Sequence, residues 1–556
     1  MFQRLGAFVS PRKALALLVI FTTVLGTMST PLYARSDSDD SKTATPIKHL
    51  VIIFQENVSF DHYFGTYPFA ENKPGEIPFH ARPNTPPVNG LFGFLRNNPN
   101  LNPANGAGAS NPFRLSPAQA ATQDQDHDYT PEQLALHGGL MDLFPLSVGK
   151  GGPPPHGTPA AVNTTGLTMG YFDGNTTTAL WNYAQFFAMS DNSWDTTFGP
   201  STPGAINLIS GQTNGVVNNV NGTGVLVDGG NGSLTVISDA DPLNDVCSSV
   251  NGEKFQMSGK NVGDLLNTAG VTWGFFEGGF DLTLTNANGT TGCKRSTKSA
   301  ITGVTKADYI PHHQPFQYYA STANPIHARP ASVAEIGHNG KANHQYDIHD
   351  FFDAVKAGNF PAVSYLKAIG QQDGHAGYSS PLDEQPFIVN VINFLQQTKE
   401  WDETAVVIAW DDSDGWYDHQ MGPIVNQSTT PADALLGPGS CGDGNTALPG
   451  VDPGTLHAQG RCGFGPRLPL QIISPFAKEN FVDDSTTDLA SILRFVEDNW
   501  LQGQRIGHGS FDTVTNSITQ MFDFKHKREN GRLILDPNTG QVVHHDGDHN
   551  GDHDRR

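Results

Sequence analysis

Residues 48–57 read KHLVIIFQEN, a short apolar run that ends abruptly in polar side chains. Uninterrupted β-branched and aromatic residues are typical of a strand that is buried on both faces. The same pattern recurs in residues 404–412, TAVVIAWDD, and in residues 469–475, PLQIISP. Apolar residues at helical spacing predict helices over 384–397 and 487–500. We therefore predict an α/β protein built on a parallel sheet with both faces covered.

The composition limits the class of protein. The 556 residues include 60 Gly and 38 Pro, and only 16% of them are charged. We therefore expect long loop insertions, notably over 84–112 and 216–292. This composition excludes a coiled coil, collagen and a charge-rich disordered chain, and no apolar run after the N-terminus is long enough to span a bilayer. The net charge of −22 argues against nucleic acid as a partner.

The N-terminus has the features of a secretory signal peptide. Arg4, Arg12 and Lys13 precede an apolar stretch over 14–28, and Ala34 offers a cleavage point. An uncleaved anchor is the alternative. We expect a secreted or periplasmic protein with four segments: a signal peptide over 1–34, a polar linker over 35–47, one large domain over 48–525 and a polar His/Asp-rich tail over 526–556.

The four cysteines fall into two local pairs. Exported proteins meet an oxidising environment, so we predict the disulfides Cys247–Cys293 and Cys441–Cys462. The alternative is a zinc site, which is disfavoured because no pair has the C-x-x-C spacing.

Hard oxygen donors follow two of the predicted strands. Glu56 and Asn57 end the first strand, and Asp411 and Asp412 end the second. Ligands of open α/β sheets bind at the carboxyl ends of the strands, so these residues are expected to meet and to bind a divalent cation. The alternative is that each pair caps a turn or a helix.

A serine and several loop histidines are further candidates. Ser201 lies in GPSTPG, residues 199–204, before an apolar stretch that predicts a helix with free amides for phosphate oxygens. Pro203 stands where the G-x-S-x-G motif requires glycine, which disfavours an α/β-hydrolase. The alternatives are a turn serine and ordinary surface or core histidines. The histidines in loops beside acidic residues or glycine are His127, His312, His313, His375 and His419.

Together these motifs resemble the bacterial secreted phosphoesterases, which comprise haemolytic and non-haemolytic phospholipases C and a respiratory-burst-inhibiting acid phosphatase. The resemblance begins with residues 49–65, HLVIIFQENVSFDHYFG. It covers roughly residues 47 to 525. It continues in the family's order through Asp126-His127, Gly199-Pro200-Ser201, residues 312–316, residues 411–419 and residues 465–469.

The resemblance implies a phosphoesterase domain with an alkaline-phosphatase-like three-layer α/β/α sandwich and long loop insertions. Val58 and Asp412 depart from the family's pattern, which often has Arg and Glu there. By motif matching, Ser201 would be the nucleophile, and the ligands of a divalent metal cation of unassigned identity would be Glu56, Asn57, Ser201, Asp411 and Asp412. The catalytic histidines around the phosphoryl group would be His127, His312, His313 and His375.

The substrate implied by the resemblance is a phosphate ester. A phospholipid diester, as for a phospholipase C, is our first interpretation, and a small phosphomonoester, as for an acid phosphatase, is the alternative. Ser201 in place of Thr favours the phosphatase branch, as does the lack of appended C-terminal β domains, but neither observation decides the substrate. A non-catalytic secreted binding protein is a remote alternative, since every motif ligand is present. We expect no nucleic acid partner and no stable membrane span, and the oligomeric state is not determined by the sequence.

Overall fold

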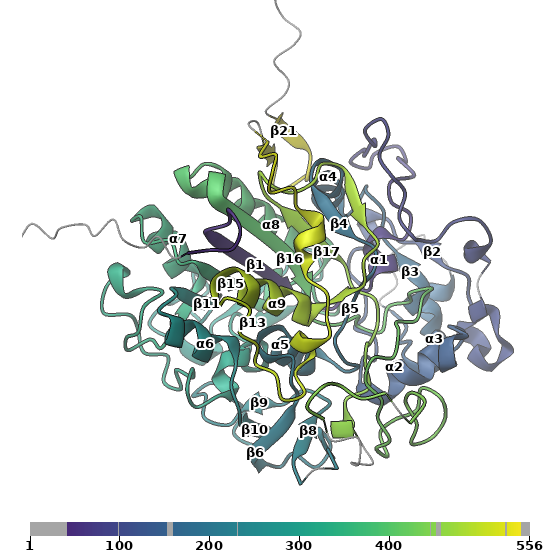
Figure 1. The fold of residues 1–556 in the computed structure, drawn as a ribbon. Coiled ribbons are helices and arrows are strands. Elements are labelled where there is room, and N and C mark those ends of the chain that lie inside the picture. The colour runs from purple at the N-terminus through teal and green to yellow at the C-terminus, as the bar shows by residue number, and fades with distance from the viewer. Residues whose placement is uncertain are drawn as a thin grey trace, which may run out of the picture. The chain divides into compact units, whose positions relative to one another are not determined.

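The computed structural model describes residues 42–545 apart from 98, 153–159, 231, 445, 452–457 and 529–530. The predicted signal peptide, part of the linker and the end of the tail lie outside these residues. Within the described part of the chain, no helix combines the length and apolarity needed to cross a membrane. Helices surround a large central sheet (Figure 1), which confirms the α/β class.

Eight strands of the described residues form the central sheet, in the order β14-β11-β15-β1-β16-β17-β4-β18. The central strands β15, β1 and β16 run parallel, and β1 pairs with β16 from His49–Thr404 to Gln55–Trp410. β16 is buried over its whole length and β1 over all of it except His49, which explains why these two strands are mainly apolar on both faces. The bounds are β1 His49–Gln55, β4 Ala188–Ser190, β11 Trp273–Glu277, β14 Gln345–Asp347, β15 Val363–Lys367, β16 Thr404–Trp410, β17 Leu470–Ile473 and β18 Phe481–Asp483.

The direction of β17 differs from the prediction of a parallel sheet. This strand runs antiparallel to both β16 and β4. A parallel strand would need a crossover that returns the chain to the opposite edge of the sheet. The described residues between 411 and 469 contain no α-helix, and β17 begins at the edge where β16 ends, because Leu470 pairs with Ala409. The chain therefore leaves β16 and enters β17 at the same edge of the sheet, beside the carboxyl end of β1.

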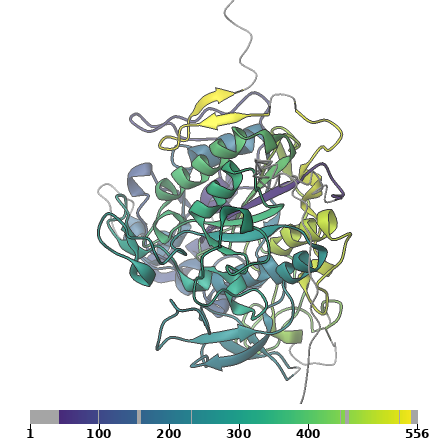
Figure 2. The same cartoon turned by 90° about the vertical axis from the view of Figure 1, so that its left-hand side faces the viewer.

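The helices that cover the sheet form two groups, which lie on opposite sides of the central strands (Figures 1 and 2). In the first group Phe352 of α7 packs edge-on against Phe394 of α8, with ring centroids 5.0 Å apart. The helices α8 and α9 confirm the two predicted helices, and α9 begins after Asp488 because that side chain caps Ala490 N–H. The first group is α4 Thr178–Phe186, α7 Ile348–Lys356 and α8 Pro381–Gln396; the second is α5 Ser201–Ser210, α6 Val262–Ala269 and α9 Leu489–Trp500.

The two predicted insertions differ from each other. The described residues of 84–112 form loops and three short 3₁₀ helices, as expected, namely η1 Gly93–Arg96, η2 Pro99–Leu101 and η3 Pro103–Gly108. Segment 216–292, by contrast, contains α6 and the core strand β11, so its prediction as an insertion is wrong there. The sequence of β11, WGFFE at residues 273–277, is too short to predict a core strand by itself. Its pairing with β14 and β15 shows that it is one. A small sheet in the order β7-β8-β6-β10-β9 accounts for much of the rest, with β6 Asn214–Val220, β7 Leu226–Asp228, β8 Leu234–Val236, β9 Asp241–Pro242 and β10 Lys254–Met257.

Part of the predicted tail packs on the domain. Strands β20 Leu533–Leu535 and β21 Val542–His545 form an antiparallel hairpin. Gln396 of α8 accepts a hydrogen bond from Leu533 N–H at 2.6 Å and donates one to its carbonyl at 2.8 Å. The His/Asp-rich residues after 545 lie outside the described part of the chain.

Both predicted disulfides are present, and the described residues contain no free cysteine. Cys247–Cys293 joins positions 46 residues apart, and Cys441–Cys462 joins positions 21 residues apart. Each bond restricts the unfolded chain, and the longer loop loses more entropy.

Replacing both cysteines of one bond by serine should therefore lower the free energy of unfolding. Chain entropy predicts a loss of about 4 kcal/mol for Cys247–Cys293 and about 3 kcal/mol for Cys441–Cys462. Denaturant unfolding of the two double variants beside the parent protein measures both values. Unchanged stability in both variants would contradict the prediction.

Candidate functional site

The carboxyl ends of β1 and β16 bring the predicted strand-end ligands together. Glu56 and Asp411 follow the paired residues Gln55 and Trp410. Asn57 N–H donates to Asp411 Oδ1 at 2.9 Å. Asn57 has a φ of 61°, a left-handed conformation that asparagine tolerates. This turn ends β1 and leaves the side chains buried at the edge of the sheet.

Ser201 joins this group from α5, of which it is the first residue. Its Oγ lies 3.0 Å from Glu56 Oε2, 3.2 Å from Asp412 Oδ2 and 3.5 Å from Asn57 Oδ1. The structure thus brings the five predicted ligand residues to one place and starts the predicted helix at the serine.

Lys367 supplies positive charge within this group. It is the last residue of β15, and its Nζ contacts Glu56 Oε1 and lies 3.8 Å from Asp411 Oδ2. Burial lowers the pKa of Lys367, but Glu56 and Asp411 outweigh burial and raise it. Burial also raises the pKa of Glu56 and of Asp412, with a further contribution from the Asp411 charge. The sequence analysis missed Lys367, although it ends an apolar strand just as Glu56 follows one.

The donor set fits a divalent cation. Asp411 Oδ2 is buried and accepts no hydrogen bond from the described residues. The remaining donors are carboxylate, amide and hydroxyl oxygens, which are the ligands that hard cations prefer. Lys367 offsets one of the three carboxylate charges of Glu56, Asp411 and Asp412, so the remaining charge matches one divalent ion.

Two of the predicted histidines lie on the Glu56 side of the site. His313 Nδ1 is 3.3 Å from Glu56 Oε1, and burial lowers the pKa of His313 well below its usual value. His312 packs edge-on against His313 with ring centroids 4.6 Å apart and is the more exposed of the two. The His312 ring lies 3.7 Å from Asp241 Oδ1 and 3.9 Å from Asp239 Oδ2.

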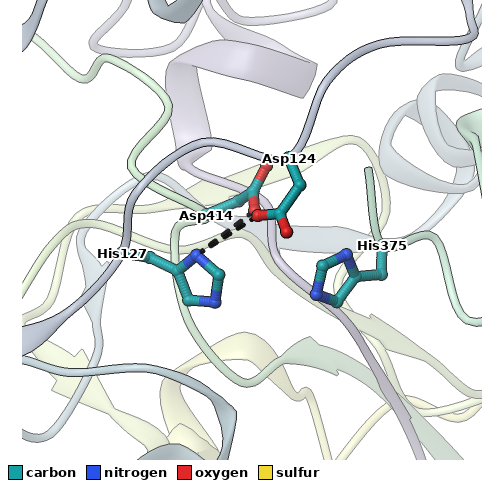
Figure 3. A group of neighbouring side chains, drawn as sticks. All are labelled: Asp124, His127, His375 and Asp414. Carbon is teal, nitrogen blue, oxygen red and sulfur yellow. Dashed lines mark ion pairs between the residues drawn. The ribbon is translucent and has the colours of Figure 1, made fainter. Parts of the chain in front are cut away.

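The other two predicted histidines lie on the Asn57 side. His127 Nε2 is 3.2 Å from Asn57 Nδ2, and the His127 and His375 rings are edge-on at 5.9 Å. Asp414 and Asp124 lie 3.4 Å and 3.7 Å from His127 Nδ1 (Figure 3). The sequence analysis assigned no role to these two aspartates, although Asp414 belongs to the motif that follows β16.

The fifth histidine belongs to a separate buried network. His419 Nδ1 is 2.6 Å from Asp61 Oδ2, and Arg467 donates to Asp61 Oδ1 at 3.1 Å and to Asp418 Oδ2 at 3.0 Å. Asp61 lies on α1 Phe60–Phe64, so these ion pairs connect the segment after β1 to both ends of the 411–469 segment.

Glu132 of α2 Tyr129–Leu136 connects the two turns that carry Ser201 and Asp412. Its Oε2 accepts from Gly199 N–H at 3.1 Å, and its Oε1 accepts from Ser413 Oγ at 2.6 Å. Burial raises the pKa of Glu132 to about 8. No sequence pattern singled out this residue, because both contacts arise from the tertiary structure.

Comparison with known proteins identifies the family. Residues 47–501 match the Phosphoesterase family. The chain belongs to the phosphoesterase family. This phosphoesterase is 24% identical over 464 residues to Phospholipase C A of Mycobacterium tuberculosis, a match that covers 81% of this chain and 72% of the relative. It is 23% identical over 463 residues to Non-hemolytic phospholipase C of Pseudomonas aeruginosa, a match that covers 81% of this chain and 53% of the relative.

These matches confirm the family predicted from the sequence and show that the protein is a hydrolase acting on phosphoric ester bonds. A solved chain from work on glycosaminoglycan metabolism by Bacteroides thetaiotaomicron covers 66% of this phosphoesterase and 80% of its own length. Its identity is 11% and its TM-score 0.28, which is too low to assign a fold.

Glu132→Ala should impair both stability and turnover of the phosphoesterase. The change leaves the Gly199 N–H and the Ser413 hydroxyl without an acceptor, at a cost of about 1–3 kcal/mol each. It also loosens the turn before Ser201, and a shift of about 1 Å in a reacting group can cost about 100-fold in rate. Denaturant unfolding and turnover of a phosphoric ester measure the two effects.

Glu132→Gln is the matched control, because the glutamine oxygen can accept Gly199 N–H while its NH₂ donates to the Ser413 hydroxyl, which can act as acceptor. We expect it to remain close to the parent protein. Equal damage in both variants would show that the hydrogen bonds are not what Glu132 contributes.

Proposed function

We propose that this protein is a secreted, metal-dependent phosphoesterase of the phospholipase C type, which hydrolyses phosphate diesters with Ser201 as nucleophile. The observation that carries the proposal is the position of Ser201 Oγ, within 3.2 Å of both Glu56 and Asp412 at the start of α5. The names of the relatives support the phospholipase C activity. The features of residues 1–34 support export, and the mixed sheet between two helix groups supports an alkaline-phosphatase-like sandwich.

Ser201 would begin the reaction by attacking phosphorus. Its hydroxyl proton faces the Glu56 and Asp412 carboxylates, which can accept it as the new bond forms. When bound by Glu56, Asn57, Ser201, Asp411 and Asp412, a divalent cation would act as a Lewis acid toward the serine oxygen and the phosphoryl group. The N-terminal end of the α5 dipole adds positive potential for phosphoryl oxygens, although Thr202 N–H is donated to Asp239 Oδ1 and Pro203 has no N–H.

The four histidines would surround the phosphoryl group, two on each side of the Glu56-Asn57 turn. We assign protonation of the leaving oxygen to His312. It is the more exposed ring of the His312–His313 pair, and Asp239 and Asp241 can orient it. Asp239 also accepts Thr202 N–H at 2.9 Å, so His312 lies beside the residue that follows Ser201. Water would then hydrolyse the phosphoserine.

The charge on the partly exposed carboxylates beside the histidines, which we call the mouth of the site, supports a diester substrate. The carboxylates of Asp124, Asp239 and Asp241 are 38%, 36% and 15% exposed beside the histidines. Lys306, which acts electrostatically on His313, offsets one of these charges. A monoester dianion is repelled by such a mouth more strongly than a diester monoanion, and a cationic head group is attracted. A zwitterionic phospholipid therefore suits this entrance better than a small phosphomonoester.

Ser201→Ala should reduce turnover by about 10⁴-fold or more, the scale seen when a catalytic nucleophile is removed. Fold and metal content should be retained, because four oxygen-bearing ligand residues remain. Ser210→Ala is a matched control: the same change at the last residue of α5, where the hydroxyl donates to Ile206 O. Substantial residual turnover by the Ser201 variant would refute the nucleophile assignment.

Paired assays should distinguish the two substrate classes. We expect faster hydrolysis of p-nitrophenylphosphorylcholine than of p-nitrophenyl phosphate between pH 5 and 8, because the carboxylate-lined mouth disfavours the dianion. A chelator should abolish turnover, and a divalent cation should restore it. Faster monoester hydrolysis would make the protein an acid phosphatase, and activity on neither substrate would support a binding protein.

A further inference from the structure

An apolar hollow lies beside α2, outside the catalytic site. It has a volume of about 590 Å³. Leu436 is 52% exposed and Leu134 is 44% exposed, so apolar surface faces solvent here. Exposed apolar surface of this kind commonly marks an interaction site. We call it the leucine hollow, and its apolar lining is Leu134, Leu143, Leu435, Leu436, Pro431 and Pro438.

The leucine hollow is formed by two segments that are distant in the sequence. The helix α2 contributes Leu134, and the loop before β17 contributes Leu436. Gln133 of α2 holds the two segments together, because its Oε1 accepts Ala434 N–H at 2.8 Å and Leu435 N–H at 3.0 Å. These hydrogen bonds fix the walls, so the hollow is part of the folded structure.

The described lining of the leucine hollow presents no unpaired charge. Its two ionisable side chains are His137 and Asp433. His137 Nδ1 lies 2.7 Å from Asp142 Oδ1. Asp433 is buried and accepts hydrogen bonds from the hydroxyls of Tyr129 and Thr430 at 2.8 Å and 2.9 Å. In a chain with a net charge of −22, such a surface suits an uncharged or zwitterionic partner.

The leucine hollow lies next to the mouth of the site. Thr130, which also lines it, follows His127 by three residues, so their Cα atoms are at most about 11 Å apart. Leu140 is 60% exposed and extends the apolar surface, because its N–H donates to the carbonyl of His137 in the lining at 3.2 Å. A phospholipid carries its acyl chains close to its phosphate. A surface that enters the acyl layer must therefore lie beside the residues that receive the phosphate.

We propose that the leucine hollow, together with Leu140, docks on the surface of a zwitterionic phospholipid bilayer. The leucines enter the apolar layer and bring the head groups to the mouth of the site. The net charge of −22 repels an anionic bilayer, and it equally repels a second copy of the chain. The inference rests on the proposed function, because a phospholipid substrate is what makes a bilayer the partner.

Sedimentation with phosphatidylcholine vesicles tests the docking surface. Binding is measured in the Ser201→Ala protein, so that the vesicles stay intact. Adding Leu140→Ser and Leu436→Ser should weaken binding about tenfold or more, because each half-exposed leucine loses about half of the free energy of full burial. Val333→Ser is the matched control and should bind as the parent does. Val333 is 39% exposed, and its carbonyl accepts from Asn359 at 2.8 Å near the amino end of β15, at the opposite edge of the sheet.

Turnover of p-nitrophenylphosphorylcholine, a soluble diester, separates the docking surface from the catalytic site. With Ser201 intact, the double leucine variant should hydrolyse it at the parent rate, which also shows that the variant folds. Leu140→Ser alone should weaken vesicle binding in the same direction, should the double variant fail to fold.

Three outcomes would overturn the docking inference. The first is equal vesicle binding by the parent and the leucine variant, or no binding by either. The second is stronger binding to vesicles that contain phosphatidylglycerol, and the third is a dimer that the leucine variant loses. Vesicle binding that depends on the leucines, without turnover of the soluble diester, would instead support the docking surface and overturn the proposed function.

Discussion

The burial of three carboxylates around one serine hydroxyl is the constraint on which this structure depends. Glu56, Asp411 and Asp412 have no exposed surface, and Lys367 is the cationic side chain in contact with Glu56. A buried charge without compensation costs several kcal/mol, so such a group persists only with a counter-charge. The lysine provides one positive charge, and the oxygen donors that remain suit a divalent cation.

The fold meets this constraint by bringing distant segments to one edge of the sheet. Parallel pairing of β1 with β16 places Glu56 beside Asp411, and β15 ends next to β1 with Lys367. The antiparallel β17 places both ends of the 411–469 segment at the same edge. Ser201 joins the group as the first residue of α5. Glu132 of α2 accepts hydrogen bonds from Gly199 and Ser413, and so connects the turn before Ser201 to the turn after Asp412. The rigid strands fix the ligands, and the loops provide the remaining polar groups.

Asn57 divides the site into two regions of different chemistry. Its left-handed backbone places the amide oxygen toward Ser201 and the amide nitrogen toward Asp414 and His127. The Ser201 side contains mainly oxygen donors, whereas the far side combines imidazole nitrogen with carboxylate oxygen. Negative charge continues to the mouth through Asp124 and Asp239, which favours substrates with a cationic group.

The sequence by itself determined the α/β class, the family, both disulfides and the strand-end positions of Glu56 and Asp411. These features depend on local apolar runs, motifs and cysteine spacing, which are visible without the fold. The direction of β17 and the core position of β11 depend on strand pairing between distant segments. Only the tertiary structure decided these, together with the contacts of Lys367 and Glu132. Lys367 and Glu56 are separated by 311 residues, and contacts of that range leave no periodic signal in the sequence.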